Sequence, residues 1–486
     1  MAAPSLWWLD ARQVAASVAA KKLSALDVAG SALARIRDVN PVLNALVQVD
    51  EEWTLAQAKD VDARVAGGEH LPMAGVPITV KDNIWVQGRV ITQGSLLFRD
   101  FVAPADAWSV DRLRRLGAVI VGITNCSEFA CKGVSNNLVY GKTRSPWNTA
   151  LTPGGSSGGA VAGVASGMSA LALATDAGGS TRRPAAHCGL VGMKPTFGLI
   201  PCFPGFDEPN FGLSVMGQIG RNVEDVAWMW RLLIDYSHHD WGSQPARVDA
   251  ADPLEPIPRG LRIAWSADLG CDFAIDDDVR QQLERVVDGL RAAGHVIDEA
   301  CPAWPDRVRE YPLIKLQQAG LASLYGDVYT KTPERIDADI GAQIALGLTH
   351  RAVDIASVLL LKEHIYAAYD EFFRHYDVLL CPTTPTVSWP VDQLGPSQIG
   401  GKPAGPRGHA GFTPLFNYCQ APACSVPAGI VRDLPIGMQV VGRRYEDGIV
   451  LRMAAEIERS IGPLPECGMW SSGALDATSA SAAERS

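Results

Sequence analysis

Hydrophobic and polar residues follow two recurring patterns along the chain, one with helical spacing and one of short apolar runs that are typical of strands. Residues 10–38 show helical spacing in two pieces, of which the second begins at a capping serine, Ser24, and closes at Pro41. The segments 107–125 and 158–176 each predict a helix followed by an apolar strand. This alternation of helix and strand predicts a layered α/β fold.

Two further strands are predicted beside polar turns. The run VPITVKDNI at 76–84 is a short apolar strand whose last strand residue is a lone lysine, Lys81. The run YDVLLCPT at 376–383 follows a helix rich in Leu and Ala over about 353–374. The helix–strand order therefore continues over the whole chain.

Composition places the chain among globular proteins. It has 486 residues, of which 47% are hydrophobic and 20% charged, a balance that allows a sizeable buried core. No internal repeat and no charged linker divides the sequence, so we expect a single domain over residues 1–470. The segment 471–486 is small and polar and is expected to be a disordered tail.

Charge and cysteine usage exclude several classes of function. The formal net charge is −10 and no run rich in Lys and Arg occurs, so we expect neither a nucleic acid nor a membrane partner. The N-terminus MAAPSLWWLDARQ lacks the basic and apolar regions of a secretion signal, which predicts a cytoplasmic protein. Ten dilute cysteines without CxxC pairs or His/Cys clusters predict reduced thiols and no metal site.

Two glycine-serine elements carry the candidate chemistry: TPGGSSGGA at 152–160 and ATDAGGSTRRPAAHCG at 174–189. Glycine lets a substrate approach the backbone closely, although a single loop of this kind is most often only a turn. In the second element, consecutive backbone N–H groups could converge to hold a developing oxyanion. These candidate donors are the amides of Ala177, Gly178, Gly179 and Ser180.

The order of the motifs is more specific than any one of them. A lysine at a strand end, then GGSSGG, DAGGSTR and CGLVGMKPT, resembles the amidase signature family in every element. The segments NPVLNALV, TNCSEFA, YDVLLCPTTP, FTPLFNYCQAPACSVPAG and PIGMQVVGRRYED extend the resemblance over nearly the whole chain. The resemblance implies a large mixed β-sheet flanked by helices on both faces and a Ser–cisSer–Lys triad that needs no metal or organic cofactor.

Matched position by position, the resemblance assigns Ser180 as nucleophile, Ser156 as the serine after a cis peptide bond and Lys81 as the base. A lysine can accept a proton from a serine only when it is neutral. Burial among hydroxyl groups disfavours the ammonium form and lowers its pKa. We interpret Asp176 and Arg182, which bracket the nucleophile loop, as a structural ion pair that shapes this loop.

The sequence departs from the usual family pattern beside the site. Lys132 stands where a small residue is usual, which leaves the shape of the pocket wall near Cys131 open. The candidate pocket residues are Cys131, Lys132 and Ser157. The other departures, which do not touch the triad, are Ile123, Thr181 and His187.

Other catalytic motifs fit the sequence less well. GGSSG also matches the nucleophile elbow of α/β-hydrolases, but WNTALTP does not provide the apolar strand that this motif requires. A Ser–His–Asp triad lacks a distinctive histidine context. The segment NNLVYGKT at 136–143 fails as a phosphate-binding loop because Asn136 replaces its first glycine. Cys188 could be a thiol nucleophile, but with no cation beside it in the sequence a packed core role is favoured.

The substrate is predicted from the variable loops at 200–218, 300–350 and 384–412. These are rich in aromatic residues, Leu and Pro and have no charged cluster, so we expect a small aryl amide or aryl carbamate (urethane) substrate, with esters also cleaved. The alternative is a glutamine-hydrolysing amidase subunit of a transamidating complex, which would share the triad. A catalytically inactive binding relative is disfavoured because all three triad positions are intact. A homodimer is possible, since many relatives form one.

Overall fold

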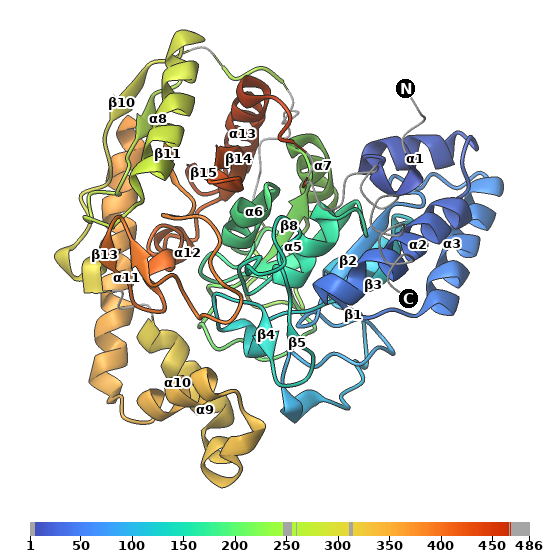
Figure 1. Cartoon of the computed structure of the whole chain (residues 1–486), viewed down its shortest axis with the longest axis horizontal. Coiled ribbons are helices and arrows are strands. Elements are labelled where there is room, and N and C mark those ends of the chain that lie inside the picture. The colour runs from blue at the N-terminus through green and yellow to red at the C-terminus, as the bar shows by residue number, and fades with distance from the viewer. Residues whose placement is uncertain (1–4, 246–254, 259, 311–313, 466, 468–486) are drawn as a thin grey trace, which may run out of the picture.

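The computed structural model describes residues 5–245, 255–258, 260–310, 314–465 and 467 (Figure 1). The tail predicted over 471–486 lies outside the described residues. Figure 1 shows the N-terminal helices at one side of the molecule and the long helix near residue 360 at the opposite side, with strands between them.

A mixed sheet of eleven strands runs through the described part of the chain. The strands are β1 (Leu46–Gln48), β2 (Pro77–Lys81), β3 (Val119–Thr124), β6 (Leu171–Asp176), β7 (Val191–Lys194), β8 (Val215–Gly220), β9 (Ile263–Trp265), β10 (Ile297–Glu299), β11 (Val378–Pro382), β14 (Ala423–Val431) and β15 (Leu434–Val441). Their spatial order is β1-β3-β2-β6-β8-β7-β14-β15-β11-β9-β10. At one end of this order, β3, β2 and β6 pair in parallel. The middle of the sheet is antiparallel, in the pairs β6–β8, β8–β7, β7–β14, β14–β15 and β15–β11. At the other end, β11, β9 and β10 pair in parallel again.

Thirteen α-helices occur among the described residues. They are α1 (Ala11–Ala19), α2 (Ala25–Leu43), α3 (Glu51–Ala66), α4 (Trp108–Arg115), α5 (Gly158–Ala165), α6 (Arg182–Cys188), α7 (Val223–Leu233), α8 (Asp277–Ala292), α9 (Ile314–Lys331), α10 (Ala338–Gly347), α11 (Ala352–His375), α12 (Pro414–Tyr418) and α13 (Asp447–Ile461).

Helices cover both faces of the sheet. Strands β2, β3, β6, β7, β8, β11 and β15 are buried at every residue, as expected for strands with a layer on each side. Helices α5 and α6 pack together on the central strands, whereas α7, α8 and α13 form a second group that contacts β8 and β14. The predicted fold class, a large mixed sheet flanked by helices, is confirmed.

Local sequence signals set the element ends close to the predicted ones. The Oγ atom of Ser24 accepts the backbone N–H of Asp27 and so caps α2. Helix α2 continues past Pro41 to Leu43 and ends where Asn44 takes a left-handed conformation, with φ of 50°. The predicted helix–strand pairs at 107–125 and 158–176 correspond to α4 with β3 and α5 with β6.

The segment 300–350 is corrected, because it is largely helical. Helices α9 and α10 occupy 314–331 and 338–347 and pack against each other. The buried side chains of Leu321, Tyr325, Ile340 and Ile344 form one apolar cluster with Phe129. This cluster joins the helix pair to the wall of the site described below.

No single helix in the described part of the chain is long and apolar enough to span a membrane. Only α10 and α11 taken together meet both conditions, and they are bent by 100° relative to each other.

Candidate active site

The parallel pairing of β2 and β6 places the candidate residues at one edge of the sheet. Lys81 is the last residue of β2, and Thr175 and Asp176 are the last two of β6. Ser180 lies in the loop that joins β6 to α6, and Ser156 lies in the loop that precedes α5. Because carboxyl ends of parallel strands meet at the same edge, residues distant in sequence come together here.

Lys81 is completely buried, and its amine contacts two hydroxyl groups. Its Nζ donates to the Oγ of Ser156 at 2.7 Å and to the Oγ1 of Thr175 at 2.9 Å. Burial lowers the pKa of Lys81 to about 8. The adjacent carboxylate of Asp82 points elsewhere, since it accepts from the backbone N–H and the hydroxyl of Thr92. The amine therefore loses its proton near pH 8, well below the range of an exposed lysine.

The loop around Ser156 is fixed by its backbone. The Gly155–Ser156 peptide bond is cis, as the resemblance implied. The carbonyl of Ser156 accepts the hydroxyl of Ser135 at 3.1 Å and the backbone N–H of Ser127 at 3.3 Å. A Cβ atom on Gly155 would lie 2.7 Å from backbone atoms of Val134, so only glycine fits this close packing. The Ser156 hydroxyl is thereby held against the amine of Lys81.

Ser180 lies at the start of α6 and is 7% exposed. It lines a cavity that also reaches Thr175 and Ala177. Among the described residues, the structure has no hydrogen bond between Ser180 and Ser156, so the second contact of the predicted relay is not formed in this state.

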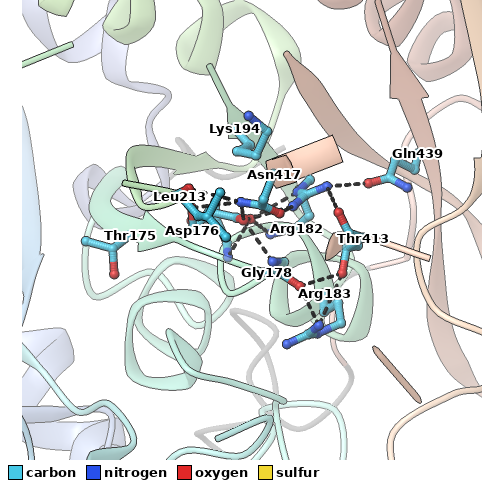
Figure 2. A network of polar contacts seen from close by, with 12 residues as sticks. Thr175, Asp176, Gly178, Arg182, Arg183, Lys194, Leu213, Thr413, Asn417 and Gln439 are labelled. Atoms are coloured by element: carbon cyan, nitrogen blue, oxygen red, sulfur yellow. Dashed lines mark hydrogen bonds and ion pairs between the residues drawn. The ribbon is translucent and has the colours of Figure 1, made fainter. Parts of the chain in front are cut away.

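The loop before Ser180 is held by the carboxylate of Asp176 (Figure 2). The N–H of Gly179 donates to its Oδ1 at 2.8 Å, and the N–H of Thr181 donates to its Oδ2 at 3.1 Å. This contact removes Gly179 from the predicted oxyanion donors, because its N–H is already used. The carbonyl of Gly178 accepts from the side chains of Arg183 and Thr413, at 2.6 and 2.7 Å.

The predicted ion pair of Asp176 and Arg182 is confirmed, with an Arg182 Nη2 to Asp176 Oδ1 distance of 2.8 Å and both side chains fully buried. Asn417 donates to Asp176 and accepts from Arg182, and Gln439 accepts from Arg182 at 2.6 Å (Figure 2). Burial alone would raise the pKa of Asp176, but the adjacent Arg182 guanidinium holds it well below its usual range. The carboxylate thus stays charged and fixes the loop amides.

The cavity at Ser180 has a volume of about 600 Å³, and seven of its lining residues are aromatic. Its aromatic residues are Trp85, Phe129, Phe197, Phe203, Phe206, Phe211 and Trp241. The described residues that line it include Asp207, Glu208 and Asp240 but no Lys, Arg or His. An apolar group without a negative charge fits this lining best.

The three predicted pocket residues do not line this cavity. Cys131 is buried, and its carbonyl accepts from Gln317 of α9 at 3.2 Å. The Nζ of Lys132 pairs with the carboxylate of Asp337 at 2.8 Å, with its side chain only 2% exposed. Ser157 begins α5, and its hydroxyl donates to the carbonyl of Thr175 at 3.5 Å. Helices α9 and α10 cover this side of the site, and Lys132 faces them.

Sequence reasoning missed Thr175 and Asn83, which contact each other at 3.0 Å beside Lys81 and line the cavity. Each stands within a motif already singled out, VKDN or ATDAGGS, and a polar residue beside a candidate base was the available signal.

Cys188 lies in an apolar cluster where burial raises the pKa of its thiol, which favours the core role. Residues 136–142 form a small hairpin of β4 (Asn136–Asn137) and β5 (Gly141–Lys142).

Comparison with known proteins extends these observations. A family model described as Amidase matches residues 27–451. An acylamidase of Rhodococcus erythropolis is 34% identical over 469 residues, which cover 94% of this chain and 96% of that protein. The A subunit of a glutamyl-tRNA(Gln) amidotransferase of Symbiobacterium thermophilum is 33% identical over 462 residues, covering 90% of this chain and 93% of that protein.

Solved structures agree with the sequence relatives. The structure of a bacterial aryl acylamidase belonging to the amidase signature family has a TM-score of 0.86 and 25% identity to this chain, covering 93% of this chain and 96% of the other. Fold, site and relatives define a hydrolase that acts on the carbon–nitrogen bond of amides. The chain belongs to the amidase signature family.

Proposed function

We propose that this protein is a serine amidohydrolase that cleaves small uncharged aryl amides or aryl carbamates through an acyl-enzyme. The observation that carries the proposal is the buried Lys81–Ser156 contact of 2.7 Å beside an aromatic cavity that Ser180 lines. In the proposal Ser180 is the nucleophile, Ser156 relays a proton and Lys81 is the base. A single domain over 1–470, a cytoplasmic location and a homodimer stay predictions from the sequence.

The first half of the reaction forms the acyl-enzyme. Neutral Lys81 takes a proton from Ser156, which takes one from Ser180 as the Ser180 Oγ attacks the carbonyl carbon. The Ser156–Ser180 hydrogen bond that this needs would form on substrate binding, because such contacts are often long in free enzymes. The oxyanion accepts from the amides of Ala177, Gly178 and Ser180.

Breakdown of the tetrahedral intermediate breaks the carbon–nitrogen bond. The proton held by Lys81 returns through Ser156 to the nitrogen, which leaves as a neutral amine while the acyl group stays on Ser180. A water molecule then attacks the ester and gives its proton to the same relay. Release of the acid returns that proton to Ser180.

The test is hydrolysis of a chromogenic anilide and a matched aryl carbamate by the purified wild type, Ser180→Ala and Cys188→Ala. We expect Cys188→Ala to retain activity and Ser180→Ala to lose it, with one serine-directed inhibitor bound per chain at Ser180 by intact mass. Hydrolysis of neither substrate by the wild type would overturn the proposed substrate class. Activity that survives in Ser180→Ala would overturn the proposed nucleophile.

The second candidate is hydrolysis of glutamine as the amidase subunit of a transamidating complex, which the names of several relatives favour. Glutamine carries a carboxylate, and a buried carboxylate is normally paired with a cation. The described residues lining the cavity provide none, which supports a neutral substrate instead. Ammonia release from glutamine at a higher kcat/KM than anilide hydrolysis would favour this second candidate.

A further inference from the structure

Three large aromatic side chains line the mouth of the cavity yet remain open to solvent. The exposed fractions are 54% for Phe203, 49% for Phe211 and 84% for Trp241. They come from two segments of the chain, 203–211 and 241, that lie outside every helix and strand. Exposed apolar side chains that line one cavity commonly mark a binding site.

The two segments are held in place by half-buried carboxylates, in addition to the packing of the Phe206 ring on neighbouring aromatic residues. Glu208 accepts the backbone N–H groups of Asn210 and Gly212, at 3.1 and 2.9 Å. Asp240 accepts the N–H of Cys202 at 2.6 Å and that of Phe203 at 3.3 Å. The aromatic rings are therefore presented on fixed backbone and are free to contact a ligand.

The backbone at Phe211 adds an independent observation. Its φ is 53°, in the left-handed region that bulky residues rarely adopt. Strained backbone of this kind is concentrated at ligand sites, where the surrounding structure maintains it. The next residue, Gly212, lies under the Trp241 indole, since a Cβ atom there would be 3.0 Å from its Cη2. The segment that carries Phe211 therefore contacts the Trp241 side chain at Gly212.

The same cavity is also lined by Phe206, Phe197 and Ser180. We infer that Phe203, Phe211 and Trp241 form an outer subsite that binds an apolar ring at the far end of an extended amide substrate whose scissile bond lies at Ser180. The substrate is the occupant because the three rings belong to the same cavity as Ser180. This inference rests on the proposed function for the reaction at Ser180, but the subsite itself concerns binding.

The experiment compares two ligands, acetanilide with one ring and N-phenyl-4-phenylbutanamide with a second ring at the end of a flexible chain. Turnover of both is measured for the wild type and for the triple variant Phe203→Ala, Phe211→Ala and Trp241→Ala. Calorimetric titration of both is repeated in a Ser180→Ala background. The matched control is Tyr366→Ala, which removes a 36% exposed aromatic residue on α11, outside the cavity lining.

We expect the ratio of the KM for the two-ring ligand to the KM for acetanilide to rise roughly tenfold in the triple variant. Aromatic contacts contribute binding free energy on this scale. The control is expected to leave that ratio unchanged. An unchanged ratio of the two KM values in the triple variant would overturn the subsite. The subsite would also be overturned if the triple variant lost binding to phosphatidylcholine vesicles, or lost a dimer that the wild type forms, while the ratio of KM values stayed the same. Absence of wild-type turnover together with a lower two-ring affinity of the triple variant in the titration would overturn the proposed function and support the subsite.

Discussion

Thr175 contacts the buried amine of Lys81, and replacing it by valine tests whether this amine is the base. The Thr175 Oγ1 accepts from the Lys81 Nζ at 2.9 Å, and Thr175 is 9% exposed. Valine keeps the shape of threonine and removes the hydroxyl, which accepts from Lys81 and also from Asn83 at 3.0 Å. The substitution therefore acts on the proton affinity of Lys81 more than on packing.

The expected shift follows from the two protonation states. A hydrogen bond from a charged donor contributes about 1.5–3 kcal/mol, and one from a neutral donor about 0.5–1.5 kcal/mol. Loss of the acceptor therefore disfavours the ammonium by about 1 kcal/mol more than the neutral amine, which lowers the pKa by roughly 0.7 units. The pKa of Lys81 lies at about 8 in the wild type. Because only neutral Lys81 accepts a proton, activity should persist to lower pH in Thr175→Val.

The assay is the pH dependence of kcat/KM for a chromogenic anilide on both sides of pH 8, which reports the free enzyme. In the wild type we expect activity to fall about tenfold per pH unit below this pKa. The control is Thr54→Val, a buried threonine that donates to the carbonyl of Ile120 away from the site. An acid limb that stays in place or moves to higher pH in Thr175→Val would refute Lys81 as the base.

Two further predictions concern the base and the ion pair. Lys81→Ala should lower kcat/KM for an anilide by roughly 10²- to 10⁴-fold. The loss for a nitrophenyl ester should be smaller, because a better leaving group needs less proton transfer. Equal losses on both substrates would contradict the proton relay. Arg182→Met should destabilise the fold by about 3–5 kcal/mol, because it leaves the Asp176 carboxylate buried without its cation. Denaturant unfolding measures this, and Arg374→Met, at an exposed pair on α11, should cost under about 1 kcal/mol.

The sequence predicted those parts of the fold and site that depend on local signals. Strands β2 and β6 are apolar runs ended by polar turns, so the sequence alone locates their ends at Lys81 and Asp176. The segment 300–350 could not be interpreted in the same way. Its helices mix Gly, Gln and Ala with apolar residues, and their burial depends on Phe129, far away in the chain.

Contacts between distant segments explain the other differences between the predicted and the observed surroundings of the site. The sequence suggests a pocket position for Lys132 because it stands near TNCSEFA, but its partner Asp337 is 205 residues away. The contact between Thr175 and Lys81 likewise depends on which strands pair, since β2 lies between β3 and β6. The register of a sheet is a tertiary property that the apolar pattern of one strand does not determine.

The hydrogen bonds of Arg182 show which sequence signal would have predicted a contact between distant segments. A guanidinium group buried beside Asp176 has more donors than one carboxylate can accept, so acceptors had to be supplied from elsewhere. They are the backbone carbonyl of Thr413, the side chain of Asn417 in α12, and the side chain of Gln439, a polar residue in β15, a strand that is buried at every position. Since an amide in such a strand is costly unless it is hydrogen-bonded, Gln439 itself implied a buried partner. A buried charged residue in a catalytic loop thus needs hydrogen-bond acceptors, and an isolated amide in an apolar strand needs hydrogen-bond partners. Pairing the two kinds of residue identifies segments that are far apart in the chain but in contact in the fold.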